Sequence, residues 1–374
     1  MAGIYIHIPF CSKACHYCDF HFSTLLKNKI AVVNSIAQEL IIQKEYLGLS
    51  KVSTIYFGGG TPSLLSTLEL EKILKTIRQN FVLEKEVEIT LEANPDDLTL
   101  EKVQELKATG INRLSIGIQS FHQNHLDFFN RSHTEKQTFL AIENAKSVGI
   151  NNLSIDLIYG FKDLTEEQLQ FNLKQISSYQ IPHVSAYALT VEPKTALSSF
   201  IKKGKVDPPS EELAKTQFLT IIDYLQKEGL THYEISNFGK PNFFSKHNTS
   251  YWKSEPYLGV GPSAHSFNGK NRQWNIANNV QYLKLIHDEK PMFQKEELTE
   301  KDKLNELIMI GLRTIWGIDK KKLSKFSSGL QKQFLNELKK YLSQQKITET
   351  ETSYVLQKKY WFLADGIASS LFQV

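Results

Sequence analysis

Short runs rich in Val, Ile, Leu or Tyr alternate with longer amphipathic stretches from the N-terminus to about residue 230. The short runs predict β-strands at residues 4–9, 54–57, 87–92, 113–119, 153–159 and 183–189, most of them ending at a Gly or Pro. The amphipathic stretches predict helices at residues 30–46, 68–80, 100–109, 134–148 and 165–179. Repeated strand–helix units predict a parallel sheet, either curled into a barrel or doubly wound. Ligand sites on such sheets lie at the carboxyl ends of the strands.

The pattern changes near residue 230, where short extended runs, many aromatic residues and several turns follow. From about residue 300 helices are predicted again, at residues 303–315, 323–326, 330–345 and 364–372, with two β-like runs at 347–349 and 354–356. Helices with a small hairpin predict a winged-helix-like module. The length of 374 residues suggests two or three domains. We expect an α/β fold with a core domain (1–230), a connecting region (231–299) and a C-terminal helical domain (300–374).

Composition adds a few limits to this picture. The chain is 41% hydrophobic and 22% charged, as globular proteins are, and no apolar run approaches the roughly 18–20 residues that span a bilayer. No secretory signal is visible, so we expect a cytoplasmic chain. The net charge of +4 is spread along the sequence, which argues against a nucleic-acid-binding face but leaves a transient membrane association open.

All three cysteines of the chain, Cys11, Cys15 and Cys18, lie just after the first predicted strand. An odd, clustered set in a reducing compartment is not a disulfide framework. Three thiolates at these spacings can converge on one inorganic centre, and a [4Fe–4S] cluster with one open iron needs only three.

Zinc is the alternative for this centre. A structural zinc site takes four ligands, and His7, His16 or His21 could supply the fourth. Such sites usually combine paired C-x2-C units, and the sequence holds no second pair. The pattern therefore favours the cluster, with a zinc-stabilised binding protein as the alternative.

Polar and glycine-rich segments follow the later strands. Residues 58–62 read GGGTP, which either forms a turn or lets the backbone approach a ligand closely. Polar residues at or near other predicted strand ends are Glu92, Gln119, Arg131, Asp156 and Thr190. Taken singly, each of these residues could be a hydrogen-bonded polar residue at a strand end, with no part in ligand binding. Together they predict one mouth that binds a ligand carrying ribose, carboxylate and adenine groups.

C-x3-C-x2-C after an initial strand, with GGGTP one unit later, resembles the radical S-adenosylmethionine (SAM) superfamily. The resemblance implies that the open iron chelates SAM and that an electron from the cluster cleaves SAM to a 5′-deoxyadenosyl radical. It also implies that Gly59, Gly60 and Thr61 bind the SAM amino group. An electron donor is then an expected partner whenever the cluster is reduced.

The ordered segments YIHIPFCSKACHYCDF, FGGGTPSLL, LEANPDDL, RLSIGIQSF and SIDLIYG resemble the oxygen-independent coproporphyrinogen III oxidase group over most of the first 190 residues. This resemblance implies a partial (β/α)6 radical-SAM barrel with a C-terminal module. It places SAM against Tyr5, Tyr17, Gly59, Gly60, Thr61, Glu92, Gln119, Arg131, Asp156 and Thr190.

Two branches of that group differ at a single position after the third cysteine. The oxidases carry a further cysteine where this chain has Phe20, and they have an N-terminal extension, whereas this sequence starts ten residues before Cys11. Phe20 therefore argues against coproporphyrinogen decarboxylation, which is kept as the alternative function.

The other branch, the HemW-type heme chaperones, is marked by H-N-x-x-Y-W, and residues 247–252 read HNTSYW. The resemblance implies that His247 ligates heme iron, a common role of neutral imidazole. His265 is a weaker candidate for the same pocket. Some chaperones place a cysteine before the motif, but Ser245 and Lys246 stand here, so a local thioether to heme is excluded.

We therefore expect a heme chaperone that binds heme and a SAM-liganded [4Fe–4S] cluster. The resemblance implies that it transfers heme to acceptor proteins such as membrane-associated respiratory enzymes. Catalytic residues, the acceptor, the oligomeric state and the use of SAM cleavage are not indicated by the sequence.

Overall fold

The structure, a computed structural model, describes residues 1–373. Its centre is a run of six parallel strands that lie side by side in chain order. They are β1 (Ala2–Ile8), β2 (Val52–Gly59), β3 (Leu83–Ala93), β4 (Arg113–Gln119), β5 (Leu153–Tyr159) and β6 (His183–Ala188). A run of neighbouring parallel strands in chain order is the arrangement of a (β/α) barrel, so the predicted fold class is confirmed.

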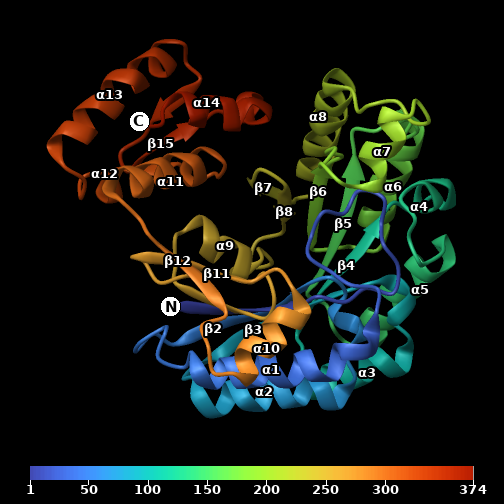
Figure 1. Ribbon diagram of the computed structural model, residues 1–374. Coiled ribbons are helices and arrows are strands. Elements are labelled where there is room, and N and C mark those ends of the chain that lie inside the picture. The colour runs from blue at the N-terminus through green and yellow to red at the C-terminus, as the bar shows by residue number, and fades with distance from the viewer. Residues whose placement is uncertain (374) are drawn as a thin grey trace.

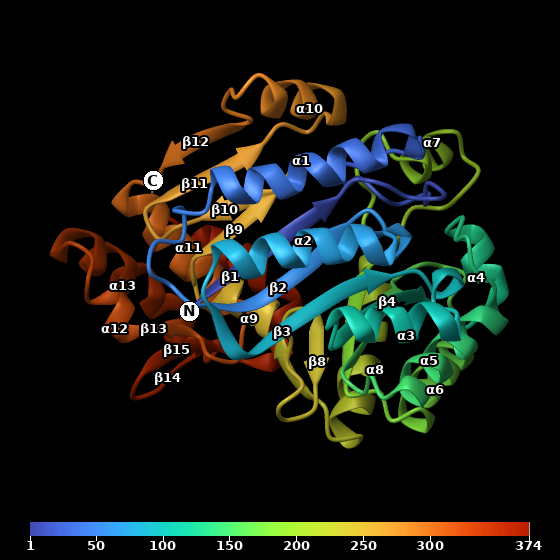
Figure 2. The same cartoon turned by 90° about the horizontal axis from the view of Figure 1, so that it is seen from below.

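Helices connect these strands and cover the outer face of the sheet (Figures 1 and 2). They are α1 (Lys29–Ile42), α2 (Thr67–Asn80), α3 (Leu100–Thr109), α4 (Gln123–Phe128), α5 (Glu135–Val148) and α6 (Glu166–Ser178), with α7 (Ala196–Lys202) and α8 (Glu211–Lys227) after β6. Figure 2 shows α1, α2 and α3 lying across β1, β2 and β3. The helix predicted at residues 30–46 ends earlier, at Ile42, because the chain turns there and buries Leu47 instead.

Residues 231–299, expected as a connecting region, add strands to the same sheet. Beyond β6 lie β8 (Asn237–Gly239) and β7 (Thr231–Glu234), both antiparallel to their neighbours. Beyond β1 lie β9 (Tyr257–Val260), parallel to β1, and then β10 (His265–Phe267), β11 (Asn271–Asn275) and β12 (Phe293–Glu297). Two further helices, α9 (Lys246–Trp252) and α10 (Asn279–His287), complete this part.

The C-terminal module packs helices around a small sheet, as the winged-helix-like prediction requires. Its elements are α11 (Glu300–Leu312), β13 (Ile318–Asp319), α12 (Lys320–Leu323), α13 (Ser328–Ser343), β14 (Ile347–Glu349), β15 (Ser353–Leu356) and α14 (Ala364–Ser370). The predicted hairpin gains a third strand, because β13 pairs with β15. The module contacts the core where the Ile315 N–H donates to the Tyr233 carbonyl at 3.1 Å.

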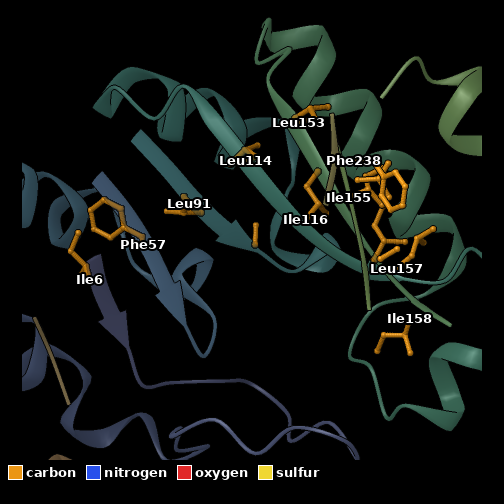
Figure 3. Packing of buried hydrophobic residues seen from close by; sticks show 14 of the residues in the cluster. Ile6, Phe57, Leu91, Leu114, Ile116, Leu153, Ile155, Leu157, Ile158 and Phe238 are labelled. Carbon is orange, nitrogen blue, oxygen red and sulfur yellow. The ribbon is translucent and has the colours of Figure 1, made fainter. Parts of the chain in front are cut away.

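The two faces of the parallel strands carry different residues because successive side chains alternate across a sheet. Apolar side chains such as Ile6, Phe57, Leu91 and Leu114 are buried in the core (Figure 3). Alternate positions such as Tyr5 face the interior of the curved sheet, where polar and aromatic groups collect. The outer face therefore stabilises the fold, and the inner face carries the candidate site.

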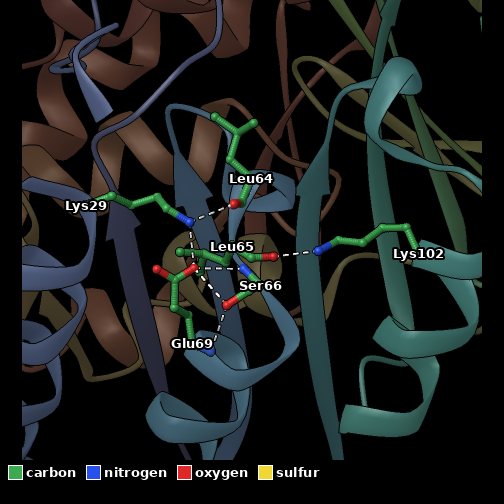
Figure 4. A network of polar contacts seen from close by, with 6 residues as sticks. All are labelled: Lys29, Leu64, Leu65, Ser66, Glu69 and Lys102. Carbon is green, nitrogen blue, oxygen red and sulfur yellow. Dashed lines mark hydrogen bonds and ion pairs between the residues drawn. The ribbon is translucent and has the colours of Figure 1, made fainter. Parts of the chain in front are cut away.

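A polar network fixes the starts of the helices near this site (Figure 4). Ser66 caps α2, and the Ser66 N–H donates to Glu69 Oε2 at 2.8 Å, which completes a capping box. Lys29 Nζ at the start of α1 lies 2.6 Å from Glu69 Oε2, and Lys102 of α3 donates to the Leu65 carbonyl. These bonds tie α1, α2 and α3 to one turn after β2.

No helix in residues 1–373 combines the length and apolar character that crossing a bilayer requires.

Candidate functional site

The three cysteines lie on one loop, residues 9–25, which follows β1, and all three are half-buried. The Cys11 N–H donates to the Ser23 carbonyl at 3.1 Å, and the Ser23 N–H donates to the Pro9 carbonyl at 2.9 Å. These bonds close the loop at its base. The cysteine loop is thereby held as a unit at the end of the first strand.

Contacts with the segment after α4 hold the far side of the cysteine loop. The His16 N–H donates to the Phe129 carbonyl at 3.1 Å, and Asn130 Nδ2 donates to the Ala14 carbonyl at 2.7 Å. The Tyr17 ring packs edge-on against Phe129 at 5.4 Å. The predicted residue Tyr17 therefore braces the loop against the barrel.

Arg131 joins the cysteine loop to two strand ends. Its Nη1 lies 3.1 Å from Cys15 Sγ, and its Nη2 lies 2.7 Å from both Asn94 Oδ1 and the Gly117 carbonyl oxygen. Asn94 follows β3, and Gly117 lies in β4. A guanidinium in this place balances negative charge on nearby thiolates.

Burial disfavours the free thiolate form of two of the three cysteines. Burial raises the pKa of Cys11, and it raises the pKa of Cys18 to about 11. Both side chains are therefore protonated at neutral pH until a metal centre displaces the proton. Three half-buried thiols beside one guanidinium fit an iron–sulfur cluster with three protein ligands.

Each candidate fourth ligand of the zinc alternative has a ring nitrogen within hydrogen-bond distance of another residue. His7 Nε2 lies 2.9 Å from the His21 carbonyl oxygen, His16 Nδ1 lies 2.8 Å from the Phe128 carbonyl oxygen, and His21 Nε2 lies 2.8 Å from Asn279 Oδ1.

The glycine-rich turn after β2 packs directly against the backbone that leads into the cysteine loop. The Gly60 N–H donates to the Ile8 carbonyl at 2.8 Å, and the Thr61 N–H donates to the Phe10 carbonyl at 2.7 Å. A Cβ atom on Gly60 would lie 2.6 Å from the Phe10 carbonyl oxygen, and Gly59 has φ +110°. Glycine is therefore required at both positions by backbone geometry.

Two carboxylates lie inside the barrel near its mouth. Glu92 accepts from the Tyr56 hydroxyl at 2.8 Å, and Asp156 accepts from Ser115 at 3.4 Å. Burial raises the pKa of Glu92 to about 7 and that of Asp156 to about 6, and the charge of Asp156 adds to the rise at Glu92. Such a pair favours a cationic ligand that also carries hydroxyl groups.

The remaining predicted residues differ in burial. Tyr5 stacks on Tyr56 at 6.1 Å, and Gln119 is buried at the end of β4 with φ +69°. Thr190 is exposed just beyond β6. Sequence reasoning missed Tyr56 and Asn94, which bond Glu92 and Arg131. Their proximity to β-strand ends was the only available signal.

His247 is buried inside the barrel, at the start of α9. Its Nδ1 lies 2.8 Å from Thr54 Oγ1, and its Nε2 lies 2.8 Å from the Tyr251 hydroxyl. The ring stacks on Tyr56 at 5.0 Å, and burial, together with the charge of Arg113, lowers the pKa of His247 to about 3. The imidazole is neutral, but in this conformation neither ring nitrogen is free to bind iron.

His265 and Phe20 lie on the surface. His265 is exposed on β10 beside Trp274, with ring centroids 6.3 Å apart. Phe20, at the position of the oxidases' further cysteine, has 66% of its surface exposed. Neither side chain is buried in the barrel that holds Glu92 and His247.

The comparisons with known proteins agree with this fold. The family model "Radical SAM superfamily" matches residues 5–176, and the model "HemN C-terminal domain" matches residues 298–363. Coproporphyrinogen III oxidase of Escherichia coli has a similar structure, with a TM-score of 0.85 over 100% of this chain and 90% of that chain. At 22% identity this likeness shows the fold alone. The molecule is thus a radical SAM protein with a HemN-type C-terminal module.

Similar curated proteins identify the family within the radical SAM proteins. The chain is 34% identical to heme chaperone HemW of Bacillus subtilis over 95% of each chain. It is 35% identical to heme chaperone HemW of Lactococcus lactis over 97% of each chain. The chain belongs to the HemW family of radical SAM proteins.

Proposed function

We propose that this protein binds heme and transfers it to acceptor proteins, and that it does so with a SAM-liganded [4Fe–4S] cluster at the mouth of its barrel. The observation that carries the proposal is the end-to-end similarity to proteins named heme chaperones. The exposed Phe20, where the oxidases have a further cysteine, supports the same choice. The proposed place of action is the cytoplasm, with transient visits to membrane-associated acceptors.

Cys11, Cys15 and Cys18 are the proposed ligands of the cluster. This proposal is supported by the position of all three cysteines on one loop and by the positive charge of Arg131 beside Cys15. When bound, such a cluster offers one open iron that chelates SAM and one electron for SAM cleavage. An electron donor is the partner that this chemistry requires.

The proposed SAM site consists of the residues around the carboxylate pair. Glu92 and Asp156 suit the cationic and hydroxyl-bearing parts of SAM, and the backbone of Gly59 and Gly60 offers a close approach. The other proposed residues are Tyr5, Tyr17, Thr61, Gln119, Arg131 and Thr190. The proposed domains are the core 1–230, the region 231–299 with the H-N-x-x-Y-W motif, and the C-terminal domain 300–374.

His247 is the proposed heme ligand, and iron binding there needs a change of partners. Nε2 becomes available when the Tyr251 hydroxyl moves away, whereas Nδ1 lies deeper against Thr54. The neutral state of the ring suits iron ligation, because a protonated imidazole cannot bind metal.

The function is tested on anaerobically reconstituted protein with two assays. We expect heme titration to give a saturable Soret band at one heme per chain, and we expect heme to pass to apomyoglobin, used as a generic acceptor. Incubation with coproporphyrinogen III, SAM and a reductant should give no protoporphyrinogen. Robust decarboxylation without heme binding would overturn the chaperone proposal in favour of the oxidase alternative.

A further inference from the structure

A pocket of about 220 Å³ lies outside the barrel, between α9, the strands β9–β11 and the helix α11 of the C-terminal module. In Figure 1, α9 and β11 lie between the strands β1–β3 and that module. The pocket is lined by Tyr251, Trp252, Ser254, Glu255, Tyr257, Phe267, Arg272, Glu306 and Ile310. Tyr251 and Trp252 are the last two residues of the H-N-x-x-Y-W motif, and the other lining residues were not predicted from the sequence.

The walls of this pocket are mainly aromatic. The Tyr251 and Tyr257 rings meet edge to face at 4.6 Å, and the Phe267 ring lies 6.5 Å from Tyr257. Trp252 adds a fourth ring. Half-buried aromatic walls of this kind bind a flat, apolar ligand surface.

Charged groups lie at one side of the pocket. Arg272 on β11 forms an ion pair with Glu306 on α11, and the Arg272 side chain is 41% exposed. Glu255 also lines the pocket and lies 3.9 Å from the N-terminal amine. Arg272 is the only lining cation in the described part of the chain, and its exposed guanidinium can donate to a second carboxylate.

The volume limits what can enter. At about 220 Å³ the pocket lies below the roughly 300–1,000 Å³ that enclose whole small molecules. One edge of a macrocycle fits such a space, and the remainder stays outside. A carrier that must release its ligand to another protein benefits from this partial enclosure, because less surface has to be freed on transfer.

We propose that this pocket binds one edge of the heme, with the aromatic rings against the porphyrin and Arg272 bonded to a propionate. The proposal rests on the heme-binding function proposed above and names further residues for it. Glu306 competes with the propionate for Arg272. Because α11 supplies Glu306 and Ile310, the C-terminal module forms one wall of the heme site.

Substitutions of Arg272 and Glu306 are expected to change heme affinity in opposite directions. Heme titration of the reconstituted full chain, followed at the Soret band, is expected to show about tenfold weaker binding in Arg272→Gln, because a charge-assisted bond to the propionate is lost. Glu306→Gln is expected to bind severalfold more tightly. Arg272→Lys should recover part of the lost affinity, and Arg78→Gln, on the outer helix α2, should bind as the wild type does.

A second ligand isolates the propionate contact. Hemin dimethyl ester lacks free carboxylates, so wild type and Arg272→Gln should bind it equally. If Arg272→Gln and Glu306→Gln both bind heme with wild-type affinity, the pocket is not the heme site, and the proposed function survives. If the wild type gives no saturable Soret band, the proposed function falls and this proposal falls with it. Equal unfolding midpoints of the variants ensure that affinity, not folding, is compared.

Discussion

His247 illustrates how one residue serves both packing and a proposed site. It is 1% exposed, both ring nitrogens are bonded, and its ring stacks on Tyr5 and on Tyr56, which also stack on each other. Replacing this ring by Ala would leave a cavity and two hydroxyls without partners, so loss of heme in that variant would not identify a ligand. A smaller change separates the two roles.

Tyr251→Phe removes only the hydroxyl that occupies His247 Nε2. If His247 ligates iron, the variant no longer has to break that hydrogen bond, so heme affinity is expected to rise about fivefold, in line with a bond worth roughly 1 kcal/mol. Titration at the Soret band measures this. Tyr257→Phe is the matched control, since Tyr257 lines the same pocket without bonding His247. Identical affinity and Soret maximum in wild type and Tyr251→Phe would contradict ligation by His247.

At the scale of elements, the starts of the helices decide how firmly the outer layer is attached to the sheet. The α2 capping box has a second task, because Glu69 also bonds Lys29 of α1 (Figure 4). The partly buried side chains of this pair, 19% and 12% exposed, make the interaction stronger than an ordinary surface ion pair.

Ser66→Ala is therefore expected to lower the free energy of unfolding by about 1 kcal/mol, since the cap oxygen accepts from the Glu69 N–H. Urea unfolding measures the difference. Ser327→Ala is the matched control, because Ser327 precedes α13 without a side-chain cap bond, and its effect is expected to be close to zero. Equal losses in both variants would show that the capping box does not stabilise α2.

The whole molecule is held together at the junction between the core and the C-terminal module. Glu234 ends β7 with 1% exposure, and its backbone bridges Thr314 just after α11. The His232 ring lies 4.4 Å from the Trp361 ring of the module. Burial raises the pKa of Glu234 to about 7, although bonds from Asn237 and the Ser236 N–H oppose the rise.

This raised pKa makes the junction sensitive to pH. The folded chain holds the Glu234 proton more tightly than the unfolded chain, whose carboxyl pKa is near 4.5, so this contribution to stability is complete below pH 4.5 and is lost as pH rises through 7. Between pH 5 and 8 the wild type should lose about 2.5 kcal/mol relative to Glu234→Gln. Urea unfolding across this range checks it, with the exposed Glu228→Gln as control. Parallel pH profiles of wild type and Glu234→Gln would refute the prediction.

The sequence by itself determined the six central strands and most of the helices around them, because hydrophobic periodicity reports which local positions are buried. The strands at residues 113–119 and 153–159 and the helix at residues 100–109 have the predicted bounds. The cysteine spacing and the glycine-rich turn could also be recognised from the sequence, because both are short, local patterns. Family membership followed from the order of these segments.

Only the tertiary structure decided what residues distant in the sequence do together. The strands after residue 230 are mostly three to five residues long, too short for a clear periodicity, and they are defined by their pairing partners. Of these strands, β9 joins the sheet beside β1 and β8 joins it beside β6. His247 meets Thr54 across 193 positions, and Arg131 meets Cys15 across 116. The pocket on α9 likewise needs α11 to close it. Local periodicity carries no information on such contacts, because they arise from the packing of the whole chain.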